Sequence, residues 1–364
     1  MGEAELVAEA KRVIDAIAAT PRFAGSAEEA RARHLCAVEL ERIGLSVSEE
    51  EFEFSQWPGR WGIPFVSALL VIATAITAAA ASRDLNLGGL AFMATFLLGP
   101  LIVSSRRQSA TAKMSWLRSR ATNLEATRGS PRVWLVAHLD SKSQSVPMLV
   151  RVASHVALLA VVVVETATLF LAQWGVVHEP HWSWIALAAV AAALPSLLCF
   201  VGNDSRGALD NATGVAAVIL ATRLAPSHLP IGVLLTSGEE LDLAGARAWR
   251  KGVARKTVMI NCDTVDDVGA WRCMYDERPH AAVLAAENRA KRLGLNLRIG
   301  RIIRGILTDT NAFNAKGLTS ITISRGTLST LARLHTPSDN LQRVTGEGAA
   351  AAARLLAGIV EELA

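Results

Sequence analysis

The stretch LVAHLDSKSQSVPMLV, residues 135–150, decides how this chain is organised. It begins as the apolar end of a strand predicted at 132–138, which carries His138 and Asp140 to a polar site. It then runs into RVASHVALLAVVVVETATLFLA, a segment long and apolar enough to be a membrane helix. A strand that ends in charged groups and a predicted membrane segment are therefore joined by only a few residues.

The composition supports membrane segments. Of the 364 residues, 51% are hydrophobic but only 5% are aromatic, so the excess consists of Ala, Val, Leu and Ile. The mean hydropathy of +0.31 is high for a soluble protein. The net charge of +4 is mild and no Lys/Arg cluster is interleaved with aromatic residues, so nucleic acid is not an expected partner. The four cysteines form no CxxC pair and indicate no disulfide framework.

Four apolar runs account for this excess, at 61–82, 85–103, 148–172 and 182–201. Each is close to the roughly 20 residues that cross a bilayer, and tryptophans lie near their ends as in an aromatic belt. The runs pair into two predicted transmembrane hairpins, 57–106 and 148–202, which would form a four-helix transmembrane bundle. The alternative, four buried core helices of a soluble protein, is disfavoured because the runs are too long and too uniformly apolar.

The remaining segments, 1–56, 107–147 and 203–364, form one predicted domain that the hairpins interrupt. We expect helices at 3–19, 27–43, 213–224, 242–251, 279–293, 310–316 and 346–363. Strands are expected at 45–54, 132–138, 230–236, 257–262, 297–303 and 318–324. Ser26 and Glu29 have the spacing of a capping box at the start of the second helix. The pattern predicts an α/β fold with a mainly parallel or mixed sheet flanked by helices.

Five short polar stretches fall at predicted strand ends and turns: AHLDS (137–141), ALDNATG (208–214), SGEELDLAG (237–245), INCDTV (260–265) and LHTPSDN (334–340). Taken singly, each is more often structural, as an HxD pair, a solvated helix start or a turn. In an open α/β sheet, however, ligands collect at the carboxyl ends of the strands, so these side chains can converge. Two histidines and three carboxylates form a ligand set suited to Zn²⁺, Mn²⁺ or Co²⁺.

The order HxD, DNATG, GEE, NCD and HTPSD resembles metallopeptidase family twenty-eight, the zinc peptidases that include bacterial leucyl aminopeptidase and glutamate carboxypeptidase II. The resemblance covers 20–54 and 122–360 but not the apolar runs. It implies the zinc aminopeptidase fold and two divalent metal ions, expected to be zinc. The implied ligands are His138, Asp210 and Asp263 for one ion and Asp210, Glu240 and His335 for the other, with Asp210 bridging both.

The resemblance also implies roles for two further carboxylates. Glu239 is the expected general base, and Asp140 is expected to orient His138. The peptide bond that follows Asp210 is expected to be cis.

A weaker part of the resemblance concerns the substrate pocket. The segment TDTNAF, 308–313, resembles the part of the family that closes this pocket, which makes Asp309 and Phe313 candidate pocket residues. The chain departs from the family pattern in one respect, because no Tyr or His that would assist the oxyanion lies close before TDTNAF.

The implied function is a membrane-anchored di-zinc peptidase of the aminopeptidase-type exopeptidase class, in which a metal-bridged water attacks the peptide bond. Two alternatives stay open. A glutaminyl cyclase shares this fold but works with one zinc, and a non-catalytic membrane scaffold of the same fold would be expected to lose ligands. The resemblance leaves open whether cleavage is amino- or carboxy-terminal, which metal is native, and whether the chain forms a homo-oligomer.

The positions of the hairpins predict how the site relates to the bilayer. The second hairpin separates His138 from Asp210, so it is expected to leave and re-enter the domain beside the metals. A membrane-associated peptide substrate would then arrive from the lipid side, although hairpins that serve only as an anchor remain the alternative.

The basic residues predict the orientation in the cell membrane. Only Arg83 lies at a hairpin tip, whereas the other Lys and Arg residues near the four span ends lie on the domain side. These are Arg60, Arg106, Arg107, Lys113, Arg118, Lys142, Arg151 and Arg206. The positive-inside rule therefore places the catalytic domain in the cytoplasm.

Overall fold

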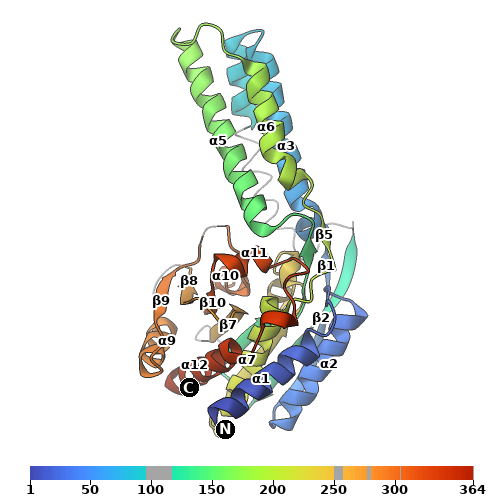
Figure 1. Ribbon diagram of the computed structural model, residues 1–364, viewed down its shortest axis with the longest axis vertical. Coiled ribbons are helices and arrows are strands. Elements are labelled where there is room, and N and C mark those ends of the chain that lie inside the picture. Colours follow the sequence, from blue (N-terminus) through green and yellow to red (C-terminus); the bar gives the residue numbers. More distant parts are fainter. Residues whose placement is uncertain (96–116, 250–256, 277–279, 304, 364) are drawn as a thin grey trace. The chain divides into compact units, whose positions relative to one another are not determined.

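The computed structural model describes residues 1–95, 117–249, 257–276, 280–303 and 305–363. The chain divides into two compact units (Figure 1). The α/β unit comprises Met1–Ser55, Ser115–Ser143 and Asn203–Ala364, and the helical unit comprises Gln56–Met114 and Gln144–Gly202. The α/β unit is thus assembled from three separate stretches of the sequence.

An eight-stranded sheet forms the centre of the α/β unit, in the order β1-β2-β6-β3-β7-β10-β8-β9. The neighbours β6, β3, β7 and β10 run parallel, whereas β1–β2, β2–β6 and β10–β8 are antiparallel pairs. The bounds are β1 (Ser46–Ser55), β2 (Arg118–Arg128), β3 (Val133–His138), β6 (Ile231–Thr236), β7 (Val258–Val265), β8 (Ala270–Tyr275), β9 (Leu297–Arg301) and β10 (Thr319–Gly326). The predicted mainly parallel or mixed α/β sheet is confirmed.

Sequence patterns do not reveal two of these strands. β2 reads RSRATNLEATR, in which polar and charged residues hide any alternation, and β8 is the short segment AWRCMY. Both are antiparallel partners at the flanks of the parallel core, β2 beside β6 and β8 beside β10. Pairing with a neighbouring strand, which no local pattern encodes, therefore defines them.

Helices cover both faces of the sheet, as the side chains of β3 illustrate. Val133, Leu135 and Ala137 belong to a larger hydrophobic core, whereas Trp134 and Val136 belong to a smaller one. Successive side chains of a strand point to opposite faces, so β3 is buried on both and reads as a continuous apolar run.

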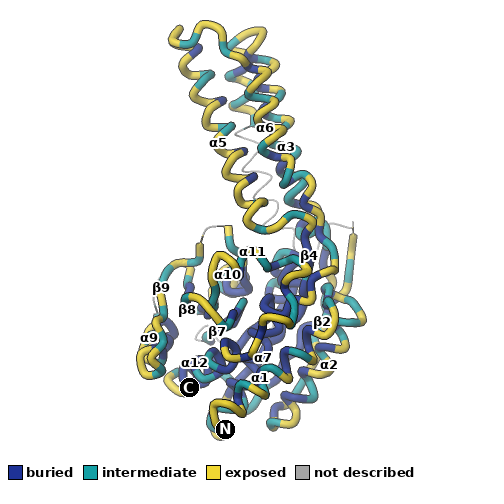
Figure 2. The backbone as a smooth tube through the Cα atoms, in the orientation of Figure 1, coloured by how far each residue is buried: buried dark blue, intermediate teal, exposed yellow. Residues whose placement is uncertain are grey.

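The two cores differ in the helices that complete them. The larger core includes residues of α1 (Glu3–Ile17), α7 (Thr213–Leu224), α9 (Ala281–Arg292) and α12 (Glu347–Leu363). The smaller core includes residues of α8 (Ala244–Ala248) and α10 (Asp309–Ala315). Figure 2 shows α7 as an almost entirely buried helix, which explains why its sequence is apolar all round.

The start of α2 (Ala27–Arg42) is capped as predicted on one side only. Ser26 Oγ accepts a hydrogen bond from the backbone N–H of Glu29 at 3.1 Å, which confirms the N-cap. The Glu29 carboxylate does not complete the predicted capping box. It accepts hydrogen bonds from Gly25 N at 2.6 Å and from Ser237 Oγ instead. This fully buried acid therefore connects the helix to the segment that follows β6.

The region after Glu240 differs from the helix predicted at 242–251. A 3₁₀ turn, Glu239–Leu241, is followed by the five-residue helix α8. Asp242 and Leu243 have φ angles of 76° and 59°, left-handed values that a continuous right-handed helix does not contain. The prediction of one long helix was therefore wrong, and its last residues lie outside the described part of the chain. A short helix that was not predicted, α11 (Leu328–Arg333), follows β10.

Two helices of the helical unit are long and apolar enough to cross a membrane, α3 (Trp57–Ala81) and α5 (Met148–Gln173). Only 22% and 17% of their most apolar windows are buried, whereas a core helix of a soluble protein is mostly buried. Ile76, Val156 and Leu159 are among their exposed side chains, each more than half exposed. These two helices are therefore not the buried core helices of the alternative reading.

The other two predicted spans are shorter in the structure. The run predicted at 85–103 is helical over Leu85–Thr95, and its remainder lies outside the described residues. α6 (Trp182–Leu197) has 16 residues. At 1.5 Å per residue it is about 24 Å long, less than the ~30 Å hydrocarbon core of a bilayer. The prediction that this run is helical to residue 201 was wrong, because α6 ends soon after Pro195 and Val201–Gly202 form the short strand β5.

Small side chains hold α5 and α6 together. Ala189 and Ala193 of α6 are fully buried in a cluster with Leu158 of α5. The hydroxyl of Ser154 lies 2.6 Å from that of Ser196, so a hydrogen bond also links the two helices. Close packing of small residues and interhelical hydrogen bonds are the contacts that stabilise helix association in membranes.

A charged cluster joins α1, α2 and α7. Glu9 accepts hydrogen bonds from Arg12 at 2.8 and 2.9 Å and from Arg223 at 2.7 Å. The same two arginines reach Glu39 of α2, at 2.9 and 3.1 Å. The hydrogen bond from Arg12, assisted by Arg223 and opposed by partial burial, lowers the pKa of Glu9 from 4.5 to about 2.

Replacing Glu9 by Gln is expected to lower the free energy of unfolding near neutral pH by about 0.5–1 kcal/mol, the scale of a partly exposed ion pair in a network. Because the folded-state pKa is depressed, this stabilisation is fully present above pH 4.5 and is lost as the pH falls toward about 2. Denaturant titrations of wild type and E9Q in detergent, repeated at decreasing pH, measure the difference. Glu41→Gln on α2 is the control, and an E9Q effect that does not shrink in acid would contradict the ion pairs.

Candidate metal centre

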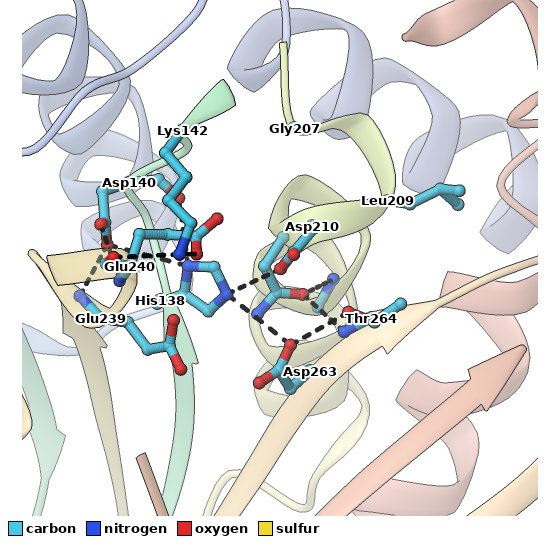
Figure 3. A network of polar contacts seen from close by, with 12 residues as sticks. His138, Asp140, Lys142, Gly207, Leu209, Asp210, Glu239, Glu240, Asp263 and Thr264 are labelled. Carbon is cyan, nitrogen blue, oxygen red and sulfur yellow. Dashed lines mark hydrogen bonds and ion pairs between the residues drawn. The ribbon is translucent and has the colours of Figure 1, made fainter. Parts of the chain in front are cut away.

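Polar residues of three of the five motifs lie at the carboxyl ends of the neighbouring strands β6, β3 and β7 (Figure 3). His138 is the last residue of β3, and Asp263 lies near the end of β7. β6 ends at Thr236, just before the turn that carries Glu239 and Glu240. Ligands of open α/β sheets collect at this edge, so the location agrees with the expected site.

Asp210 lies in the turn that leads into α7, and the peptide bond that follows it is cis, as predicted. The next residue explains the DNATG motif. Asn211 Nδ2 donates to Cys262 O at 2.9 Å, and Asn211 Oδ1 accepts from Gly214 N at 3.1 Å. A Cβ on Gly214 would lie 2.2 Å from Asn211 Oδ1, so only glycine fits there. The motif therefore fixes the turn that holds Asp210.

Asp339 supports the same turn from the far end of the sequence. Its Oδ1 accepts a hydrogen bond from Leu209 N at 2.7 Å, and its Oδ2 accepts one from Asp210 N at 3.2 Å. Asp339 is fully buried, and burial raises its pKa to about 7. The segment LHTPSDN thus contributes His335 to the site and a support for Asp210, a second role that the motif alone did not reveal.

A buried arginine connects the two sides of the site. Arg22 donates to Leu139 O at 2.9 Å, to Arg206 O at 2.6 Å and to Gly207 O at 3.0 Å. It is fully buried, and these carbonyls satisfy its guanidinium. Arg22 therefore ties the residue after His138 to the loop before Asp210. It was not predicted, because a single arginine in PRFAGS carries no sign of burial.

Asp140 positions the Glu-Glu turn. Its Oδ1 accepts from Glu239 N at 3.1 Å and its Oδ2 accepts from Glu240 N at 3.2 Å. The expected orientation of His138 comes from the backbone of the same residue, because Nδ1 lies 3.1 Å from Asp140 O but 3.7 Å from Asp140 Oδ1. A carbonyl only accepts, so Nδ1 of a neutral His138 carries the proton and Nε2 is left as the ligand atom.

Two groups of donor atoms meet at Asp210. His138 Nε2 lies 3.0 Å from Asp210 Oδ1 and 3.6 Å from Asp263 Oδ1. His335 Nε2 lies 3.1 Å from Asp210 Oδ2 and 3.1 Å from Glu240 Oε2. Within each group the donor atoms lie within 4.8 Å of one another. The two oxygens of Asp210 therefore face different imidazoles, as in a bridging carboxylate.

The site concentrates negative charge in a buried place. Burial raises the pKa of Glu239 well above its usual value, and Asp263 raises it further while His138 opposes the rise. Burial also raises the pKa of Asp263. At Asp210 the effect of burial is outweighed by His138 and His335, which lower its pKa. Buried carboxylates in this number are costly unless cations compensate them.

The donor set fits divalent metal ions. Imidazole nitrogens and carboxylate oxygens are the ligands of zinc and related ions. Glu240 Oε1 is buried and has no hydrogen-bond partner among the described residues, so a ligand atom is left over. His138, Asp210 and Asp263 would hold one ion, and Asp210, Glu240 and His335 would hold the other.

The two weaker candidates, Asp309 and Phe313, are both fully buried. Asp309 accepts a hydrogen bond from Thr236 Oγ1 at 2.5 Å and has its pKa raised to about 7 by burial. The ring of Phe313 packs edge-on against Trp249 with 5.9 Å between centroids. Phe313 belongs to the smaller core, and its place in the substrate pocket stays a prediction.

The ammonium group of Lys142 places a positive charge at the site. Its Nζ lies 2.8 Å from Glu240 Oε2 and 3.1 Å from Glu240 O, and the side chain is 12% exposed. The sequence had indicated Lys142 only as a basic residue near a span end. No motif marks its contact with Glu240, which is distant in the sequence.

Sequence comparison identifies one family. The model described as peptidase family M28 matches residues 121–360, a range that contains all five predicted metal ligands. Among curated proteins, no sequence matches this chain.

Solved structures share the fold. The aminopeptidase from Aneurinibacillus sp. strain AM-1 has a TM-score of 0.59 at 15% identity, covering 97% of this chain and 93% of that one. The zinc aminopeptidase from Bacillus subtilis has a TM-score of 0.57 at 14% identity, covering 98% and 95%. The glutaminyl cyclase from Fimbriiglobus ruber has a TM-score of 0.53 at 13% identity, covering 100% and 95%. At these identities the likeness establishes the fold alone.

Replacing Asp210 by Asn is expected to remove metal from both groups, because each group loses the same carboxylate charge. Replacing Asp263 by Asn affects one group, so about half of the wild-type metal content is expected at saturating zinc. Equilibrium dialysis followed by metal analysis measures both variants. Equal metal content in D210N and D263N would contradict a shared ligand.

Proposed function

This chain belongs to peptidase family M28 and is a metallopeptidase, and on that premise we propose that it is a membrane-anchored di-zinc exopeptidase of the aminopeptidase type. The observation that carries the proposal is the position of Asp210 between His138 and His335, with one carboxylate oxygen directed at each imidazole. Such a carboxylate can serve two cations at once, which one isolated ligand group cannot do.

The residues divide into two tasks under this proposal. His138, Asp210 and Asp263 would hold one zinc ion, and Asp210, Glu240 and His335 would hold the other. When bound, the ions lower the pKa of a water molecule toward neutrality and polarise the scissile carbonyl.

Glu239 performs the proton transfers. It belongs to neither donor group, and Figure 3 shows its carboxylate on the side of His138 where Asp263 lies. It accepts a proton from the attacking water and passes it to the leaving amine. Glu239 N donates a hydrogen bond to Asp140 Oδ1 at 3.1 Å. This bond fixes the backbone of Glu239 and so helps to keep its carboxylate in place during both transfers.

The alternatives are less well supported. Glutaminyl cyclases from Fimbriiglobus ruber and Porphyromonas gingivalis share the fold, with TM-scores of 0.53 and 0.55, so the fold alone does not exclude cyclisation. The presence of two complete donor groups favours a two-metal hydrolase over a one-zinc cyclase. The same completeness, together with Glu239, argues against a scaffold without activity.

The membrane enters the proposal through chain connectivity. The α/β unit is interrupted after Ser143 and continues from Asn203. An extended chain spans at most about 3.6 Å per residue, so these points lie within roughly 18 Å of His138 and 25 Å of Asp210. We infer four spans that anchor the protein in the cell membrane, with the catalytic unit in the cytoplasm and its site near the bilayer surface. The short helix α6 would be accommodated by local thinning of the bilayer. A membrane-associated peptide would then reach the site from the lipid side.

The variant Glu239→Gln is expected to lower kcat by about 10²–10⁴-fold while zinc content stays unchanged, because it removes a proton acceptor and no ligand. Peptides with free and with acetylated amino termini, digested by wild type and variant, provide the measurement. Glu240→Gln is the matched control, since it should lose metal as well as activity. Release of pyroglutamate from glutaminyl peptides without hydrolysis would point to the cyclase instead.

Orientation can be measured by single-cysteine labelling, because the four native cysteines are buried. In intact cells, an impermeant maleimide is expected to label Val176→Cys, which is 64% exposed at a hairpin tip. Leu328→Cys, 73% exposed in the α/β unit, should react only after the cells are opened. Labelling of Leu328→Cys in intact cells would place the catalytic unit outside the cytoplasm.

A further inference from the structure

We propose that Lys142 makes the two metal sites unequal, by competing with a cation for Glu240 and so weakening the Asp210–Glu240–His335 site relative to the His138–Asp210–Asp263 site. The inference rests on the proposed di-zinc function and concerns a residue that neither the motifs nor the family match indicates. It predicts one tightly and one weakly bound ion in the wild-type protein.

The first argument is a shared oxygen atom. Lys142 Nζ lies 2.8 Å from Glu240 Oε2, the same atom that lies 3.1 Å from His335 Nε2. The pair is nearly buried, with Lys142 12% and Glu240 4% exposed. A divalent ion bound by Glu240 would have the Lys142 ammonium as a close neighbour, and like charges repel strongly where water is largely excluded. The other donor group has no such ammonium at its carboxylates among the described contacts.

The second argument concerns the imidazoles. His138 has its Nδ1 held by Asp140 O at 3.1 Å, which fixes the ring with Nε2 facing the ligands. His335 Nδ1 is buried and has no hydrogen-bond partner among the described residues. Hydrogen bonds of this kind orient metal-binding histidines and raise their basicity, so the His138 site is the better prepared of the two.

The third argument is that the backbone on both sides of Lys142 is held in place. Its neighbours are pinned: Ser141 Oγ donates to Ser205 O at 3.1 Å, and Ser143 Oγ accepts from Asp204 N at 2.9 Å. Ser141 Oγ also accepts from Arg22 N at 2.9 Å. With the residues on both sides fixed, the backbone directs the Lys142 side chain toward Glu240 (Figure 3).

The test is a zinc titration of the full-length protein in detergent, in competition with a chromogenic chelator. Wild type is expected to show two dissociation constants, of which His335→Gln abolishes the weaker and Asp263→Asn the tighter. Lys142→Met removes the charge at similar volume. It is expected to tighten the weaker site by about 10–100-fold, the scale on which groups next to metal ligands act, and to leave the tighter site unchanged.

Two variants serve as controls. Lys142→Arg keeps the positive charge and should keep the weaker constant near its wild-type value. Arg206→Gln removes a charge from the exposed side chain of the neighbouring loop and should change neither constant. Retention of the tighter site in Lys142→Met shows that this variant is folded, and Lys142→Gln replaces it if that site is lost.

The outcomes separate this inference from the proposed function. Two equal constants in wild type, or a weaker site that does not tighten in Lys142→Met, would overturn the role of Lys142 and leave the di-zinc centre standing. A weaker site that loosens further in Lys142→Met would identify Lys142 as a support of Glu240, which also overturns the inference. Absence of zinc binding in wild type would instead refute the proposed function itself.

Discussion

Asp210 presents each of its carboxylate oxygens to a different imidazole, and the architecture of the α/β unit depends on keeping it there. His138 and His335 lie far apart in the sequence and lie 3.0 and 3.1 Å from its two oxygens. A displacement of the turn before α7 would disturb both donor groups together. Asp339 and Arg22 hold this turn by its backbone, so two residues outside both donor groups keep Asp210 in position.

The negative charge buried at the site explains why the residues that support it are themselves buried and charged. A site with this many carboxylates is unfavourable until cations enter it, so the fold must hold the ligands against their mutual repulsion. Backbone hydrogen bonds provide that restraint. Asp140 binds the two N–H groups of the Glu239–Glu240 turn, and Asp339 binds those of Leu209 and Asp210. Asp140 and Asp339, which belong to neither donor group, therefore fix the backbone of the carboxylates at the site.

Sequence patterns predicted the elements whose burial is visible in a short stretch of residues. β3 was identified because a strand buried on both faces is continuously apolar, and its polar end marked His138. The convergence of the five predicted ligands was expected from the motifs and the family resemblance. The sequence could not assign roles to Lys142 and Arg22, because burial and partners distant in the sequence decide those roles. The same holds for β2, which only its pairing with β6 defines as a strand.

The insertion of the second helical hairpin is tolerated because its two ends are joined within the α/β unit. Ser143 accepts a hydrogen bond from Asp204 N, and Ser141 donates to Ser205 O, so the chain leaves and returns at neighbouring points. Because the entry and exit of the hairpin are hydrogen-bonded to each other, a long segment can be inserted there without moving His138 or Asp210. Lys142 lies at this insertion point, between Ser141 and Ser143. The insertion point therefore does more than pass the chain to the helical unit, since it also places a positive charge against Glu240 and alters the charge balance of the site.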